Sequence, residues 1–177
     1  MLYYSVHKKE GETMPDQMNF VAIIQALGLT TLFVGLIGFE RQKRHKIVGL
    51  TTHLLVALGA ASITIVQEQL AYDAYQLALT NPELVPSIVI ERQRIVAQII
   101  SGVGFLGTGA ILKTKGSISG LTTASTLWAS AIIGIIFGYG EFILGMTVSI
   151  LMLFVLVIVK AYIRKHQYTD YHDYEEE

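Results

Sequence analysis

The chain contains five apolar stretches long enough to cross a lipid bilayer, and this pattern leaves few folds open to it. A helix that crosses the hydrocarbon core needs about 20 mostly apolar residues. Stretches close to this length run from Phe20 to Phe39, Ile47 to Val66, Ile95 to Leu112, Leu121 to Gly138 and Phe142 to Tyr162. Because 52% of the residues are apolar and only 15% are charged, composition also favours a membrane protein. We therefore expect an all-α fold, a polytopic membrane helix bundle with about five transmembrane helices.

Lysine and arginine are distributed unevenly between the two sides of this predicted bundle. One side holds nine of them: Arg41, Lys43, Arg44, Lys46, Lys113, Lys115, Lys160, Arg164 and Lys165. The other side holds four: Lys8, Lys9, Arg92 and Arg94. Because positively charged flanks are retained in the cytoplasm, we place the N-terminus outside and the C-terminus inside the cell. Residues 1–17 then form an external leader, residues 18–166 the transmembrane domain and residues 167–177 an acidic cytoplasmic tail.

Two connections between the predicted spans have distinct compositions. The connection from Gln67 to Arg94 carries two prolines and mixed charges, so we expect a solvent-side loop, whose start is compatible with a continuation of the second helix. The segment from Lys113 to Gly120 is short and basic, and we expect a cytoplasmic turn.

Several sequence patterns resemble catalytic or ligand-binding motifs but lack the required context. Gly102, Gly104 and Gly107 spell GxGxxG, yet no strand precedes them and Leu127 occupies the position of a ribose-binding acid. The segment GSISG centres on Ile118 rather than on a nucleophilic serine. The chain has no cysteine and a net charge of −1, which argues against thiolate chemistry and nucleic-acid binding. We predict no catalytic residue, no enzyme activity, no cofactor and no metal ligand set.

Polar residues at membrane depth are the best functional candidates, because each is costly unless it faces protein or water. For Glu40 we expect pairing with a loop lysine or arginine, and for Arg41 pairing with backbone carbonyls or lipid phosphate. Headgroup snorkelling of both side chains is the alternative. We expect His53 to be a hydrogen-bonded packing residue, because no second ligand stands three or four residues away.

Further polar and small residues gather in the third and fourth stretches. Gln98 and Ser101 lie one turn apart in the third stretch, and the start of the fourth carries Thr122, Thr123, Ser125 and Thr126. If the two helices form a hairpin, Thr108 or Thr114 approaches these hydroxyls, and a polar pocket between the helices is expected. Trp128 is a candidate for this pocket or for an interfacial anchor. Small residues permit close helix approach in membranes, and the predicted packing positions are Gly102, Gly104, Gly107, Gly109, Gly134 and Gly138. The GxxxG pair Gly134 and Gly138 is compatible with an internal contact or with a contact between two copies.

Four ordered motifs together resemble the MgtC/SapB family of bacterial membrane proteins: GFERQ at 38–42, GLTTHLLVALGA at 49–60, RIVAQIISGVGFLGTGAIL at 94–112 and GLTTASTLWASAIIG at 120–134. The resemblance implies a five-span protein of the bacterial plasma (inner) membrane with an external N-terminus. It also implies a link to low-magnesium adaptation, and regulation of other membrane proteins rather than an established transport mechanism. Among the residues that match the family pattern are Glu40, Arg41, His53, Arg94, Gln98, Thr122, Thr123 and Trp128. The chain resembles a short form without the soluble C-terminal domain of some members.

Two main functional hypotheses follow for a protein embedded in a lipid bilayer, beside a third, an intramembrane hydrolase that would use His53 with a hydroxyl of the fourth stretch such as Ser125. The first is a non-enzymatic regulator that docks its helix faces against a membrane-protein partner or against another copy in a homo-oligomer. The alternative is a small cation (Mg²⁺) transporter or channel, which would draw on Glu40, His53, Gln98 and the threonines. Mg²⁺ generally prefers carboxylates and retained waters, so Mg²⁺ binding stays open.

Overall fold

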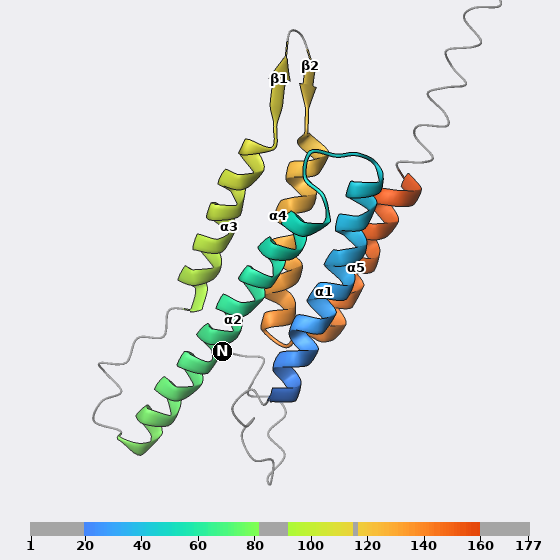
Figure 1. The fold of residues 1–177 in the computed structure, drawn as a ribbon. Helices are drawn as coiled ribbons and strands as arrows, with labels where there is room; N and C mark the ends of the chain where they lie inside the picture. The colour runs from blue at the N-terminus through green and yellow to red at the C-terminus, as the bar shows by residue number, and fades with distance from the viewer. Residues whose placement is uncertain (1–19, 82–91, 115–116, 160–177) are drawn as a thin grey trace, which may run out of the picture.

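The structure is a computed structural model that describes residues 20–81, 92–114 and 117–159. Its elements are α1 (Phe20–Lys43), α2 (Leu50–Thr80), α3 (Arg92–Gly109), β1 (Leu112–Thr114), β2 (Ser117–Ser119), α4 (Leu121–Gly138) and α5 (Phe142–Phe154). Five π-helical residues, Val155–Val159, extend α5. The helices lie side by side as a bundle (Figure 1), which confirms the predicted all-α membrane fold.

Four of the described helices are long and apolar enough to cross a membrane: α1, α2, α4, and α5 together with its π-helical extension. The helix that falls outside this set is α3, which begins with charged residues and carries Gln98 and Ser101 among its glycines. It nevertheless lies alongside α4 and α2 (Figure 1). The predicted third span is therefore a helix of the bundle that is more polar than its neighbours.

α2 is longer than the sequence analysis predicted. It continues to Thr80, so much of the connection expected to be a loop after Val66 is helical. The segment from Gln67 onward is rich in Ala, Leu and Gln, which are good helix formers, and contains no glycine or proline. The helix ends just before Pro82, as expected for a residue that cannot continue it.

The predicted turn from Lys113 to Gly120 is a β-hairpin. β1 pairs with β2 in antiparallel fashion, with Leu112 opposite Ser119 and Thr114 opposite Ser117. Gly120 follows with φ of 91°, a left-handed conformation that favours glycine. The hairpin projects from the end of the bundle where α1 ends and where α2 and α4 begin (Figure 1). We call this end the hairpin end.

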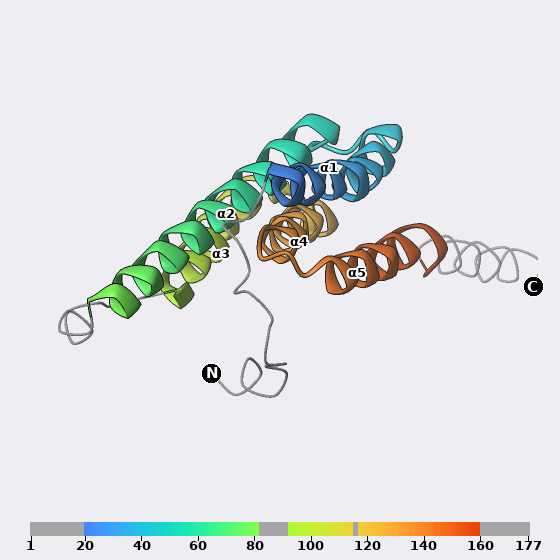
Figure 2. The same cartoon turned by 90° about the horizontal axis from the view of Figure 1, so that it is seen from below.

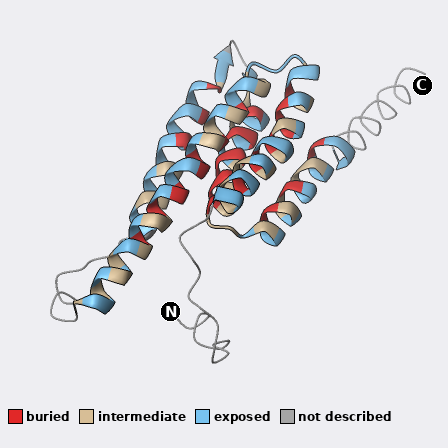
Figure 3. Cartoon of the chain, turned by 60° about the horizontal axis from the view of Figure 1, so that its bottom comes forward, coloured by how far each residue is buried: buried red, intermediate tan, exposed pale blue. Residues whose placement is uncertain are grey.

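α4 is the central helix of the bundle. It packs against α2, α1, α3 and α5, and more of it is buried than of any other candidate span in the described chain. Ile133 and Phe137 of α4 form an apolar core with Val34, Ile37 and Ala57. α3 and α5 lie on opposite flanks (Figure 2) and are mostly exposed (Figure 3).

Candidate functional site

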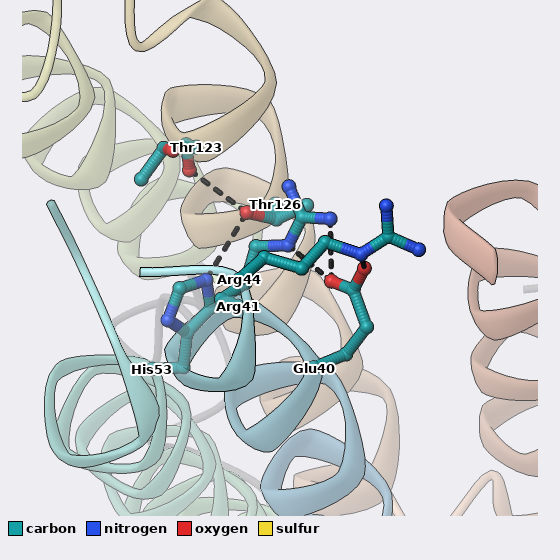
Figure 4. A network of polar contacts seen from close by, with 6 residues as sticks. All are labelled: Glu40, Arg41, Arg44, His53, Thr123 and Thr126. Carbon is teal, nitrogen blue, oxygen red and sulfur yellow. Dashed lines mark hydrogen bonds and ion pairs between the residues drawn. The ribbon is translucent and has the colours of Figure 1, made fainter. Parts of the chain in front are cut away.

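A buried polar cluster lies at the hairpin end, where three helices meet (Figure 4). We define the polar cluster as Glu40, Arg41, Arg44, His53, Thr123 and Thr126. α1 and the turn that follows it supply Glu40, Arg41 and Arg44, α2 supplies His53, and α4 supplies the threonines. Arg41 and His53 are both 0% exposed, so the groups that are most expensive to bury lie deepest in the cluster.

Glu40 forms ion pairs with both arginines of the polar cluster. Its Oε2 accepts a hydrogen bond from Nε of Arg41 and also forms an ion pair with Nη2, and its Oε1 forms an ion pair with Nε of Arg44 one turn later. The pairing of Glu40 with Arg44 of the turn after α1 confirms the expected loop partner of Glu40, whereas the expectation that Arg41 pairs with backbone carbonyls or lipid phosphate is wrong. Adjacent residues diverge on a helix, but the long arginine side chain folds back far enough to reach its neighbour (Figure 4). One carboxylate is shared by two guanidinium groups, and Nη1 of Arg41 has no hydrogen-bond acceptor among the described residues.

His53 links α2 to α4 through Nε2, while its Nδ1 bonds the start of its own helix. Nδ1 lies 2.7 Å from the carbonyl oxygen of Gly49, and because a carbonyl only accepts, Nδ1 carries a proton. Nε2 lies 3.1 Å from Oγ1 of Thr126, which is also 2.9 Å from the Thr123 carbonyl. Both nitrogens are thus hydrogen-bonded, as was expected of a packing histidine.

The Thr126 hydroxyl has one proton and two acceptors within reach. When His53 is neutral, Nε2 accepts that proton and the Thr123 carbonyl is left without it. When Thr126 donates to Thr123 instead, Nε2 must be the donor, which requires the doubly protonated ring. The hydrogen-bond pattern between α2 and α4 therefore depends on the protonation state of His53.

The structure does not assemble the predicted pocket from Gln98, Thr122 and Thr123. Thr123 is buried in the polar cluster, whereas Thr122 is exposed. Gln98 lies eleven positions before Gly109, the last residue of α3, which is about three turns from the hairpin end. α3 and α4 are neighbours, but their polar residues lie at different distances from the hairpin end.

The other predicted polar positions lie at the surface of the bundle. Arg94 is exposed near the start of α3, and it takes part in a polar interaction there. Trp128 is 43% exposed on α4, which suits the interfacial anchor more than a buried pocket.

The predicted packing glycines fall into two groups. A Cβ at Gly134 would lie 2.2 Å from the Ala57 carbonyl oxygen, and one at Gly138 would lie 2.8 Å from that of Ala61. Their GxxxG pattern therefore faces α2 within the chain, and Gly107 meets Ala124 at an ordinary contact distance of 3.6 Å.

The remaining three predicted packing glycines all lie on α3. A Cβ at Gly102, Gly104 or Gly109 would meet no other heavy atom within 4 Å in the described part of the chain. No contact among the described residues therefore confirms the prediction that these glycines pack helices together. These glycines point away from α4 and α2. The spacing of small residues in the sequence does not show in which direction each one points.

Three further residues, Gly38, Gln42 and Thr126, hold the site together. Gly38 brings α1 onto α2, since a Cβ there would lie 2.8 Å from the Cα of Leu50. The Gln42 side chain accepts from the Leu50 N–H at 3.3 Å and so caps the start of α2. Thr126 lies three residues after Thr123 on one buried face of α4, as helical spacing predicts.

α3 presents a second surface of interest, which we call the outer face of α3: Gln98, Ser101, Gly102, Phe105 and Gly109. All five are exposed, and Phe105 reaches 82% exposure. Thr108 donates to the carbonyl of Gly104 at 3.0 Å, but within the described ranges the side chains of Gln98 and Ser101 form no hydrogen bond. The outer face thus combines two uncharged polar side chains, two glycines and one large aromatic side chain, and the described residues leave it exposed.

Fold and site together define a polytopic α-helical membrane protein whose buried polar groups join three helices. A family model described as the MgtC family matches residues 27–165. The chain therefore belongs to the MgtC family.

Curated relatives support the same assignment. The chain is 42% identical over 130 residues to YhiD of Escherichia coli (strain K12), covering 73% of this chain and 57% of YhiD. It is 43% identical over 109 residues to the protein MgtC of Brucella abortus (strain 2308), covering 62% and 39% of the two chains. It is 35% identical over 147 residues to the protein MgtC of Salmonella typhimurium, covering 83% and 56%. The chain thus spans less than two thirds of the length of these relatives, and no solved structure matches it.

Proposed function

We propose that this protein is a non-enzymatic regulator of other membrane proteins in the bacterial plasma membrane, linked to magnesium limitation or stress adaptation. It acts by docking exposed helix faces against membrane partners. Membership of the MgtC family and the names of the relatives support the link to magnesium. The observation that carries the choice of regulator over transporter is the pairing of Glu40 with two arginines.

A path for Mg²⁺ requires oxygen ligands, above all carboxylates. Glu40 was the best candidate on its side of the membrane, but its carboxylate is shared by Arg41 and Arg44. The polar cluster therefore has an excess of positive charge, which opposes entry of a divalent cation. Across the described ranges, moreover, no three His, Asp or Glu side chains gather to hold a metal ion.

The polar groups of the cluster instead join helices. His53, Thr126 and Gln42 connect helix starts and ends, while the outer face of α3 and most of α5 are left exposed. Extensive exposed helix surface around a rigid polar centre suits a protein that works by contact with other membrane helices.

The proposed orientation places the hairpin end in the cytoplasm and the N-terminus outside. Arg41, Lys43, Arg44 and Lys46 all lie at the hairpin end, which supports this orientation because positive flanks are retained inside.

Transport of Mg²⁺ is the alternative function, and one observation favours it. α2 extends beyond its predicted end and carries Glu68, a half-buried carboxylate next to the buried amide of Gln67. YhiD is also connected by name to magnesium transport.

Liposome flux separates the two functions. The full chain is purified, reconstituted into liposomes that contain a Mg²⁺-sensitive dye, and exposed to an inward Mg²⁺ gradient. We expect uptake no faster than in protein-free liposomes. The proposal would be overturned in favour of transport by gradient-dependent uptake with two further properties. Glu68→Gln or Glu40→Gln would abolish this uptake, and the exposed control Glu141→Gln would retain it.

A further inference from the structure

We propose that the outer face of α3 binds the same face of a second copy of this chain. The inference rests on the proposed function, in which the protein works by helix docking, and it names the partner of this face. It draws on three properties of α3: polarity at membrane depth, uncovered glycines, and a spacing that fits a parallel helix pair.

The membrane depth of α3 makes lipid a poor occupant of its outer face. α3 packs along α4 and α2, both of which are candidate spans, and an 18-residue helix is about 27 Å long. Gln98 lies about 9 Å from the start of this helix, which places its carboxamide among hydrocarbon chains. A polar group there is costly unless another protein group accepts and donates hydrogen bonds.

The glycines of the outer face provide room for another helix. Among the described residues, no atom of another element lies near the place of a Cβ at Gly102 or Gly109, so a neighbouring backbone could approach closely. Phe105 stands between them with 82% of its surface exposed. A large side chain between two glycines can pack against the corresponding glycine of a partner helix, where there is space for it.

A second copy fits this face because it enters the membrane in the same orientation. Under two-fold symmetry about the membrane normal, Gln98 meets Gln98 of the other copy at the same depth. A carboxamide is both donor and acceptor, so two of them satisfy each other. The outer face carries no charge, so identical faces do not repel.

The spacing of the outer face also matches a parallel pair. Gln98, Gly102, Phe105 and Gly109 follow one another at intervals of four, three and four residues. This is the seam of a left-handed helix pair, in which one polar residue sets the register.

Cysteine crosslinking in native membranes tests the proposal, since the chain contains no cysteine of its own. Ser101→Cys adds a thiol to the outer face with little change in size. Thr147→Cys is the matched control, because Thr147 is an exposed hydroxyl residue on α5. With a short bifunctional maleimide, we expect a covalent homodimer at twice the 19.5 kDa chain mass for Ser101→Cys, at least about fivefold more abundant than for Thr147→Cys.

A second substitution tests whether close approach at the glycines is needed. In the described part of the chain, a Cβ at Gly102 meets no atom within 4 Å, so Gly102→Leu blocks a second helix, whereas Gly28→Leu adds the same side chain at an equally open glycine of α1. We expect the Ser101→Cys homodimer to fall at least about fivefold with Gly102→Leu and to persist with Gly28→Leu, at equal amounts of inserted protein.

The outcomes separate this inference from the proposed function. Any of three results would show that a second copy does not occupy this face. The Ser101→Cys dimer is no more abundant than the Thr147→Cys dimer, the crosslinked product has another mass, or the dimer is unaffected by Gly102→Leu. None of these results bears on the liposome flux, which tests the regulatory function by itself.

Discussion

Replacing Gly134 by alanine should loosen the contact between α2 and α4. The added Cβ would lie 2.2 Å from the carbonyl oxygen of Ala57 and 3.0 Å from its carbonyl carbon. Both are backbone atoms that cannot rotate away, so the two helices must separate by roughly 1 Å to restore normal contact distances. A gap of this size forfeits about a quarter to a half of the dispersion energy at the seam.

The same separation acts on the hydrogen bond between His53 and Thr126. This bond is already 3.1 Å long, so further separation would carry it past a useful length. Overpacking of this kind costs about 1–3 kcal/mol, and a lost interhelical hydrogen bond in a membrane protein adds about 0.6 kcal/mol. We expect Gly134→Ala to lower the free energy of unfolding by about 2–3 kcal/mol.

Unfolding by SDS in mixed micelles measures this loss. The single tryptophan, Trp128, lies on α4 and reports its environment by fluorescence, while circular dichroism reports helix content. Gly59→Ala is the matched control, because it adds the same methyl group on α2 where no atom lies within 4 Å. Neutral surface changes alter the free energy of unfolding by up to about 0.5 kcal/mol. If the free energies of unfolding of Gly134→Ala and this control differ by no more than that, the close approach of α2 and α4 is refuted.

Three further substitutions probe the polar cluster and the hairpin end by the same unfolding measurement. Thr126→Val removes the hydrogen bond to His53 and should cost about 0.6 kcal/mol. Glu40→Gln leaves the buried Arg41 without its carboxylate and should cost about 3 kcal/mol. Gly120→Ala should cost at least about 2 kcal/mol, because its φ of 91° is strained for alanine and its Cβ would lie 2.0 Å from a carbonyl oxygen.

Matched variants control each of these effects. Thr126→Ser keeps the hydroxyl and should retain most of the stability, so an equal loss would argue against the hydrogen bond. Glu141→Gln neutralises an exposed carboxylate and should be nearly neutral. Gly140→Ala shares a left-handed φ of 77° but meets no atom within 4 Å, so a loss as large as that of Gly120→Ala would contradict the proposed clash.

Hydropathy predicted the fold well because membrane crossing depends on length and apolar content. It placed the starts of α4 and α5 correctly, since both begin directly after a glycine or an acidic turn. It left open how far α2 continues after Val66, because good helix formers extend a helix after the apolar residues stop. The hairpin at Lys113 was also missed, since strands of three residues leave almost no periodic signal.

The candidate site was less predictable because it depends on which way each side chain points. His53 and Thr123 were chosen for their residue type, and both lie in the polar cluster (Figure 4). Gln98 was chosen for the same reason but lies on another face at another depth. Small-residue spacing likewise cannot tell Gly134, which meets α2, from Gly102, which meets nothing described.

The unequal lengths of α2 and α4 give α2 the mechanics of a lever. Both helices start at the hairpin end, but α2 has 31 residues and α4 has 18, so α2 extends past α4 by about 20 Å (Figure 1). Treated as a rigid rod that pivots at Ala57, where Gly134 touches it, α2 has one arm of about 6 Å to His53 and another of about 35 Å to Thr80. A sideways movement of about 3 Å at Thr80 then moves His53 by about 0.5 Å, enough to break its 3.1 Å bond to Thr126.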